Sequence, residues 1–122
     1  MNEGPVSEAH TPTITADPLV DAHIHPDKSS WGGRWLSRTQ ASTLRDFIDN
    51  DVTTQAGYTR PVEERTLALF RAAAAHGTRA LRAHVDVGPA QKLANVHGVR
   101  AAADRMAGLL DVQIVAFPQQ GL

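Results

Sequence analysis

The sequence contains no cysteine, few aromatic side chains and no long hydrophobic run, and these absences narrow what the chain can be. Without cysteine it forms neither a disulfide nor a thiolate metal site, so any metal ion must be bound by imidazole or carboxylate groups. No stretch of about 18 consecutive apolar residues occurs, and the N-terminus lacks a cationic patch followed by an apolar run. We therefore expect a cytoplasmic protein without a membrane span.

An excess of charge of one sign is also missing. Lys and Arg number 12 and Asp and Glu number 13, which gives a formal net charge of −1. Such a balance creates no extended field that would attract nucleic acid or an anionic membrane surface. Neither nucleic acid nor a membrane is therefore an expected partner.

Strand and helix patterns alternate along the chain from residue 18 onward. Residues 1–17 show neither periodicity, so we expect a flexible leader there. The predicted strands cover residues 18–25, which read as a buried strand, 79–87 and 112–117. The predicted helices cover residues 61–76 and 91–110, and a further short helix is expected over residues 42–50, where Leu44, Phe47 and Ile48 share a face.

The helix over residues 61–76 has the clearest start and stop signals. Pro61 suits the first turn, and Gly77 is a typical residue at which a helix ends. Its expected apolar stripe is formed by Val62, Leu69, Phe70 and Ala73.

The order strand, helix, strand, helix, strand predicts an α/β protein with parallel strands joined by right-handed crossovers. We interpret residues 18–122 as part of a (β/α)8 TIM-type barrel, about its first three parallel strands with the intervening helices, because a complete barrel needs ~250 residues. Three parallel strands with helices on one side leave two sheet edges and one face uncovered. We therefore expect association with a missing C-terminal half, or self-association through the sheet edges.

Two histidines at the end of the first predicted strand are candidate metal ligands. His23 and His25 are separated by one residue, so the two-residue period of a strand places both imidazoles on the same face. In a parallel α/β barrel, active sites lie at this carboxyl end of the strands. The alternative is that the two imidazoles contact only solvent or core groups.

Three sequence blocks, PLVDAHIHPDKSSWGGRW, RALRAHVDV and DVQIVAFPQQGL, resemble cytosine deaminase-like metal-dependent amidohydrolases over residues 18–122. In that family the first barrel strand ends in His-x-His, often followed by Leu-Asp-Lys. Here Pro26 replaces the leucine, and Asp27 and Lys28 follow it. The His-Val-Asp element of the second strand is matched by residues 84–86, and the aromatic-Pro-Gln element after the third strand by residues 117–119.

The resemblance implies a role for several residues. His23 and His25 would bind one divalent metal ion, zinc or iron(II), and Gln119 would bind the ring amide of the substrate. His84 would lean into the same pocket as a hydrogen-bond donor or as a charge partner of Asp86; a histidine satisfied by backbone groups is the alternative. The family's remaining ligands, a His and an Asp, and its proton-transferring Glu come from later strands, so no catalytic residue is expected within this chain.

Two aspartates lie near the histidine pair, and three further histidines lie elsewhere in the chain. Asp21 and Asp27 are candidates to orient an imidazole through its second nitrogen, with turn residues as the alternative. His10, His76 and His97 are expected at the surface, without a role.

The function that the resemblance implies is hydrolytic deamination of a small nitrogen heterocycle, a cyclic amidine or amide such as cytosine or a related pyrimidine or triazine. The chain alone is expected to be inactive. One alternative is a metal-dependent phosphoesterase, because related-looking barrels of that class also begin with His-x-His. Another is a non-catalytic, truncated gene product or a partner-binding α/β fragment.

Overall fold

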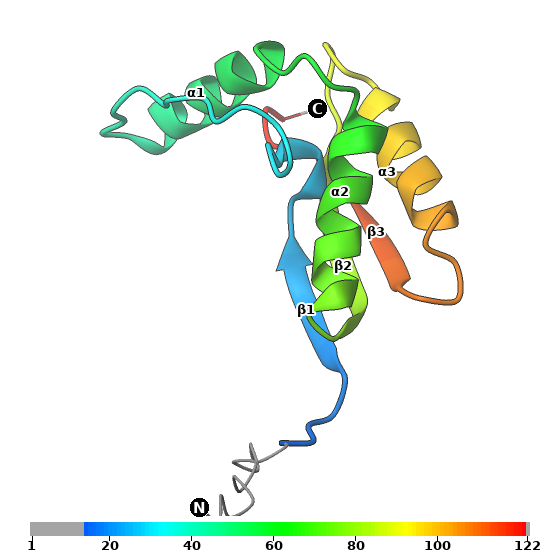
Figure 1. Cartoon of the computed structure of the whole chain (residues 1–122). Helices are drawn as coiled ribbons and strands as arrows, with labels where there is room; N and C mark the ends of the chain where they lie inside the picture. The colour runs from blue at the N-terminus through cyan, green and yellow to red at the C-terminus, as the bar shows by residue number, and fades with distance from the viewer. Residues whose placement is uncertain (1–13, 122) are drawn as a thin grey trace, which may run out of the picture.

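A computed structural model describes residues 14–121 and shows a three-stranded parallel sheet covered by two helices (Figure 1). The strands β1 (Leu19–Ile24), β2 (Thr78–Asp86) and β3 (Asp111–Phe117) are paired in the order β1-β2-β3. Helices α2 (Val62–Ala75) and α3 (Ala94–Asp104) connect successive strands and pack on one face of the sheet. The chain is therefore α/β, and its architecture matches part of a TIM-type barrel, as the sequence predicted.

Of the predicted leader, residues 1–13 lie outside the described residues, and residues 14–17 are exposed and have no regular secondary structure. No helix within residues 14–121 is both long and apolar enough to span a membrane.

The core lies between α2, α3 and the central strand β2. Leu81, Ala83 and Val85 alternate along β2 and are all buried against the helices. From α2, Leu67 and Phe70 reach this core. The full set of buried core residues is Leu67, Phe70, Leu81, Ala83, Val85, Val99, Ala102, Met106 and Leu110.

The apolar stripe predicted for α2 was correct only in part. Phe70 is fully buried, but Leu69 is half-buried and Leu67 takes the core position instead. Leu67, Phe70 and Ala74 recur at helical spacing and face the sheet together. The second half of α2 is rich in alanine, so its sequence did not show which of two neighbouring helix faces packs against the sheet.

Helix α3 is shorter than the predicted range of residues 91–110. It begins at Ala94, because Lys92 adopts a left-handed conformation with φ 50°, and it ends at Asp104, before a series of turns that includes Gly108 at φ 80°. Met106 and Leu110 are nevertheless buried in the core. The helical spacing of apolar residues thus continues through a segment that is not helical.

The prediction that the first strand is buried was wrong. Leu19 and Val20 are 55% and 70% exposed. Within the described residues, β1 pairs only with β2, and the helices cover only one face of the sheet. An apolar run with turn signals cannot distinguish a central strand from an edge strand.

The long connection between β1 and α2 contains helix α1 (Leu44–Ala56), which extends to one side of the carboxyl ends of the strands (Figure 1). It is longer than the predicted helix and has no buried residue. The predicted apolar face is not packed, because Leu44 and Phe47 are 76% and 58% exposed. Polar contacts described below attach α1 to the sheet.

Helix α1 begins with a capping box that makes its stability depend on pH. The Thr43 side chain accepts from the Asp46 backbone N–H, and the Asp46 carboxylate accepts from the Thr43 backbone. Hydrogen bonds from the Ser42 backbone, then from Thr43, hold the pKa of Asp46 below its usual value of 3.8. A lowered pKa in the folded state stabilises the helix above pH 3.8, and this contribution is lost as the pH falls through the folded value.

We therefore expect amide-exchange protection of the first turn of α1 to decrease on acidification below about pH 4. The Asp46→Asn variant, which carries no titrating group at this position, should lack this component of the pH dependence. Hydrogen exchange followed by NMR from pH 6 to pH 3 measures it. Equal pH profiles for the two proteins would contradict the assigned role of Asp46.

Candidate metal centre

The structure brings His23 and His25 together at the carboxyl end of β1. His23 lies within the strand, and His25 directly follows it as the N-cap of the short 3-10 helix η1 (Pro26–Lys28). Their Nε2 atoms are 3.2 Å apart. Two nitrogens bound to one tetrahedral zinc ion at ~2.0–2.1 Å lie about 3.3 Å apart, so the two imidazoles fit a shared metal ion.

The chemical state of His25 also suits a ligand. Burial, and then the nearby Lys28 ammonium, lower the pKa of His25 below its usual value of 6.5. The neutral imidazole is the form that binds a metal ion. His25 Nδ1 is buried and has no hydrogen-bond partner among the described residues.

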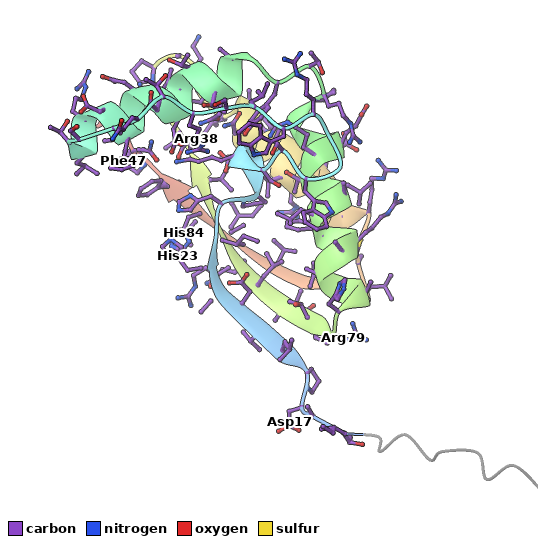
Figure 2. All side chains as sticks on the ribbon, turned by 60° about the vertical axis from the view of Figure 1, so that its left-hand side comes forward. Asp17, His23, Arg38, Phe47, Arg79 and His84 are labelled. Atoms are coloured by element: carbon purple, nitrogen blue, oxygen red, sulfur yellow. The ribbon has the colours of Figure 1, made fainter. Side chains whose placement is uncertain are left out.

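His84 and Phe117 complete an aromatic cluster around the pair. The His84 ring stacks on His23 with 4.1 Å between centroids, and Phe117 lies 5.3 Å from the His25 ring. Figure 2 shows His23 and His84 side by side, with Arg79 at the opposite end of β2. The structure thus places three histidines from two adjacent strands at one site.

Lys28 occupies the centre of a polar network beside this cluster. Its ammonium lies 3.3 Å from carboxylate oxygens of both Asp51 and Asp86, and it donates to the side-chain oxygen of Gln119. Asp86 Oδ1 has no aligned hydrogen bond, so its contact with Lys28 is an ion pair only. Burial alone would raise the pKa of Asp51, but Lys28, with Arg38, holds it below the usual value.

The network places Gln119 at the carboxyl end of the sheet. The Gln119 Nε2 atom lies 3.5 Å from Asp51 Oδ2, while the amide oxygen accepts from Lys28. The Lys28 ammonium in turn lies 5.5 Å from the centre of the Phe117 ring. Gln119 is therefore connected to the histidine cluster through Lys28 and Phe117.

The two aspartates that flank the histidine pair contact no imidazole. Asp21, which lies within β1, accepts a hydrogen bond from the His23 backbone N–H. Asp27 is fully buried, and its Oδ2 accepts from the Asp86 backbone and from Asn95, both at 3.0 Å. Burial raises the pKa of Asp27. Among the described residues, neither carboxylate is therefore hydrogen-bonded to an imidazole: Asp21 is bonded to the His23 backbone, and Asp27 to the Asp86 backbone and Asn95.

His84 forms no charge pair with Asp86, contrary to one predicted role, because Asp86 contacts Lys28 and Gln55 instead. His84 Nδ1 is buried without a partner, so no backbone group satisfies that nitrogen either. Of the histidines expected at the surface, His76 and His97 are exposed, and His10 lies outside the described residues.

Residues of α1 that join the site were not predicted from the sequence. Asp51 and Gln55 lie one turn apart and face Lys28 and Asp86. In the sequence, these two residues are marked only by their i, i+4 spacing within the long connection between β1 and α2, which does not indicate a role in a site. Lys28 was recognised as part of a motif, but its partners come from α1, β2 and the segment after β3.

Two imidazoles do not by themselves form a complete metal site. Within residues 14–121, no group of three or more His, Cys, Asp or Glu side chains is arranged to bind a metal ion. His23 and His25 would fill only half of a four-coordinate shell.

Comparisons with known proteins identify relatives of the chain. No protein-family model matches the chain. It is 33% identical over 104 residues to YahJ, an uncharacterised protein of Escherichia coli K12. The matched region covers 84% of this chain and 23% of that protein. It is also 33% identical over 107 residues to N-isopropylammelide isopropyl amidohydrolase of Pseudomonas sp. strain ADP. That match covers 84% of this chain and 27% of the enzyme.

A solved structure supports the same relationship. The crystal structure of N-isopropylammelide isopropylaminohydrolase from Burkholderia multivorans superposes with a TM-score of 0.76 at 36% identity, over 86% of this chain and 26% of that one. The similarity supports the amidohydrolase type without singling out cytosine deaminases. The chain spans about a quarter of the length of these relatives, and over that part it is related in sequence and in fold to amidohydrolase-type enzymes.

Proposed function

We propose that residues 18–122 form the part of a metal-dependent amidohydrolase that supplies two metal ligands and part of the substrate pocket. The observation that carries the proposal is the 3.2 Å separation of the His23 and His25 Nε2 atoms at the carboxyl end of a parallel strand. The similarity to amidohydrolase-type enzymes supports it independently.

His23 and His25 would hold one divalent ion, and zinc and iron(II) both accept imidazole ligands. When bound, the ion would supply Lewis acidity for hydrolysis at a ring carbon. The low pKa of His25 keeps its ring neutral, and therefore able to bind, near neutral pH. The ligands that complete the shell would come from outside the described residues.

Gln119 would select the substrate through its side-chain amide. Lys28 can only donate and the Asp51 carboxylate accepts, so these two neighbours fix which end of the amide is oxygen and which is nitrogen. One lone pair on the oxygen and one N–H on the nitrogen remain available. An amide held in this way offers both an acceptor and a donor to the edge of a cyclic amide.

The proposed substrate is a small nitrogen heterocycle with an amine or alkylamine leaving group. Cytosine and related pyrimidines or triazines present the donor and acceptor edge that Gln119 would match. The Pseudomonas and Burkholderia relatives act on N-isopropylammelide according to their names, so this compound and cytosine are the first two candidates.

Metal binding tests the proposal directly. We expect the 122-residue chain to bind one equivalent of zinc or iron(II) weakly, because two imidazoles leave half of the shell to water. The His23→Ala, His25→Ala double variant should not bind. Isothermal titration calorimetry, under anaerobic conditions for iron(II), measures both.

A second double variant, His76→Ala with His97→Ala, is the matched control, because it removes two exposed histidines. It should bind like the unmodified chain. If binding survives loss of His23 and His25 but disappears in the control variant, the site is wrongly assigned.

A further inference from the structure

We infer that His84 is a positioning residue that holds the His23 imidazole in place by stacking, and that it is not a third metal ligand. The consequence for metal affinity rests on the proposed function, whereas the stack itself does not. Nothing in the comparisons assigns a role to this residue.

The relative orientation of the imidazole rings shows whether His84 can bind the same metal ion as His23 or only packs against it. A ligand lone pair lies in the plane of its imidazole ring. The planes of His23 and His84 are inclined by only 16° with centroids 4.1 Å apart, so their in-plane lone pairs run side by side and do not converge on one ion. The planes of His23 and His25 are inclined by 60°, and their Nε2 atoms meet at 3.2 Å.

His23 needs such a support because of where it lies. Its side chain is exposed, and among the described residues its one hydrogen bond is with the ring of His25. The pairing of β1 with β2 is irregular between Asp21 and Ile24, the segment that contains His23. Regular pairing with β2 therefore does not fix the backbone at this ligand.

His84 is held far more firmly. It lies in the central strand β2, between Ala83 and Val85, which are both fully buried. The Phe117 ring from β3 meets its edge at 86° and 6.4 Å between centroids. Stacking thus transfers the rigidity of the central strand to a ligand on the neighbouring strand β1.

The experiment compares His84→Phe, which keeps an aromatic face but loses both nitrogens, with His84→Ala, which loses the ring. His97→Ala is the control for removal of an exposed histidine. In the metal-free chain, NMR follows the ring-proton shifts of His23 and the nuclear Overhauser effects between the His23 and His25 rings. We expect His84→Phe to retain those contacts and the upfield ring-current shift, and His84→Ala to lose both.

Zinc titration of the same variants gives the metal-dependent result. Removing a group that orients a metal ligand typically lowers affinity 10–100-fold, so we expect a loss of about tenfold or more for His84→Ala and less than about threefold for His84→Phe. The His97→Ala affinity should not change.

The outcomes distinguish a stacking role of His84 from a role that requires its ring nitrogens. If His84→Phe disturbs the His23 ring or lowers zinc affinity as much as His84→Ala does, a nitrogen of His84 is required and the inference is overturned. If the NMR result holds but even the unmodified chain binds no metal, the stack is upheld and the proposed function fails instead.

Discussion

Replacing Lys28 with methionine is expected to lower the free energy of unfolding by about 3–5 kcal/mol, the cost of leaving a buried charge without its partner. The Lys28 side chain is 10% exposed, and it neutralises Asp86, whose side chain is 5% exposed. Methionine preserves the length of the side chain but not the charge. Helix α1 should also lose part of its attachment to the sheet, because Asp51 is held through Lys28, while Gln55 keeps its own contact with Asp86.

Urea unfolding followed by circular dichroism measures the change, and hydrogen exchange shows whether α1 is released. Arg45→Met is the matched control, since Arg45 pairs with Asp49 on the same helix with both side chains exposed, and such pairs contribute at most about 1 kcal/mol. Adding Asp86→Asn to Lys28→Met should recover part of the loss, because the uncompensated carboxylate is then gone. Equal effects of the Lys28 and Arg45 substitutions would show that the network contributes no more than a surface ion pair.

Replacing Phe70 with alanine is expected to destabilise the fold by about 3–5 kcal/mol, because it removes a large ring from a closely packed interior. Phe70 is fully buried between α2 and the sheet, and no larger side chain in the described residues is as completely enclosed. The same urea experiment measures the effect. Leu109→Ala, at a position that is 63% exposed, should change stability by no more than about 0.5 kcal/mol.

The two substitutions should also differ in what they disturb. Loss of Phe70 affects the contact of helix and sheet, so protection from exchange should decrease throughout β2 and α2. Loss of Lys28 should affect α1 first. If Phe70→Ala left the protection of β2 unchanged, the core would have to lie elsewhere.

The sequence predicted the elements that local patterns determine. The helix between Pro61 and Gly77 and the order of three strands were confirmed, because start signals, stop signals and periodicity lie close together in the chain. The exposure of Leu19 and Val20 was not predicted, since it depends on which strand occupies the edge of the sheet. The end of α3 was also misplaced, because Met106 and Leu110 reach the core from turns.

In the candidate site, too, features set by local spacing were predicted, and contacts made by tertiary packing were not. The proximity of His23 and His25 follows from their two-residue spacing at the end of β1, and the structure shows it. The partners of Lys28 could not be predicted, because Asp51 and Asp86 are distant from it in the chain and are brought together only by tertiary packing. The same reason explains why Asp27 was misread: its buried partner Asn95 comes from α3.

The two histidines of the candidate metal centre are held in place to different degrees by their surroundings. His25 is followed by Pro26 and Asp27, both fully buried, and the Asp27 carbonyl oxygen accepts a 2.8 Å hydrogen bond from the buried Arg65. His23 is exposed and lies in β1, which within residues 14–121 pairs only with β2 and does so irregularly. Displacement of His23 would be opposed chiefly by its stack on His84, so an ion of larger radius would be accommodated on the His23 side of the site while His25 stays fixed. Discrimination among metal ions at this pair would then depend on the compliance of β1.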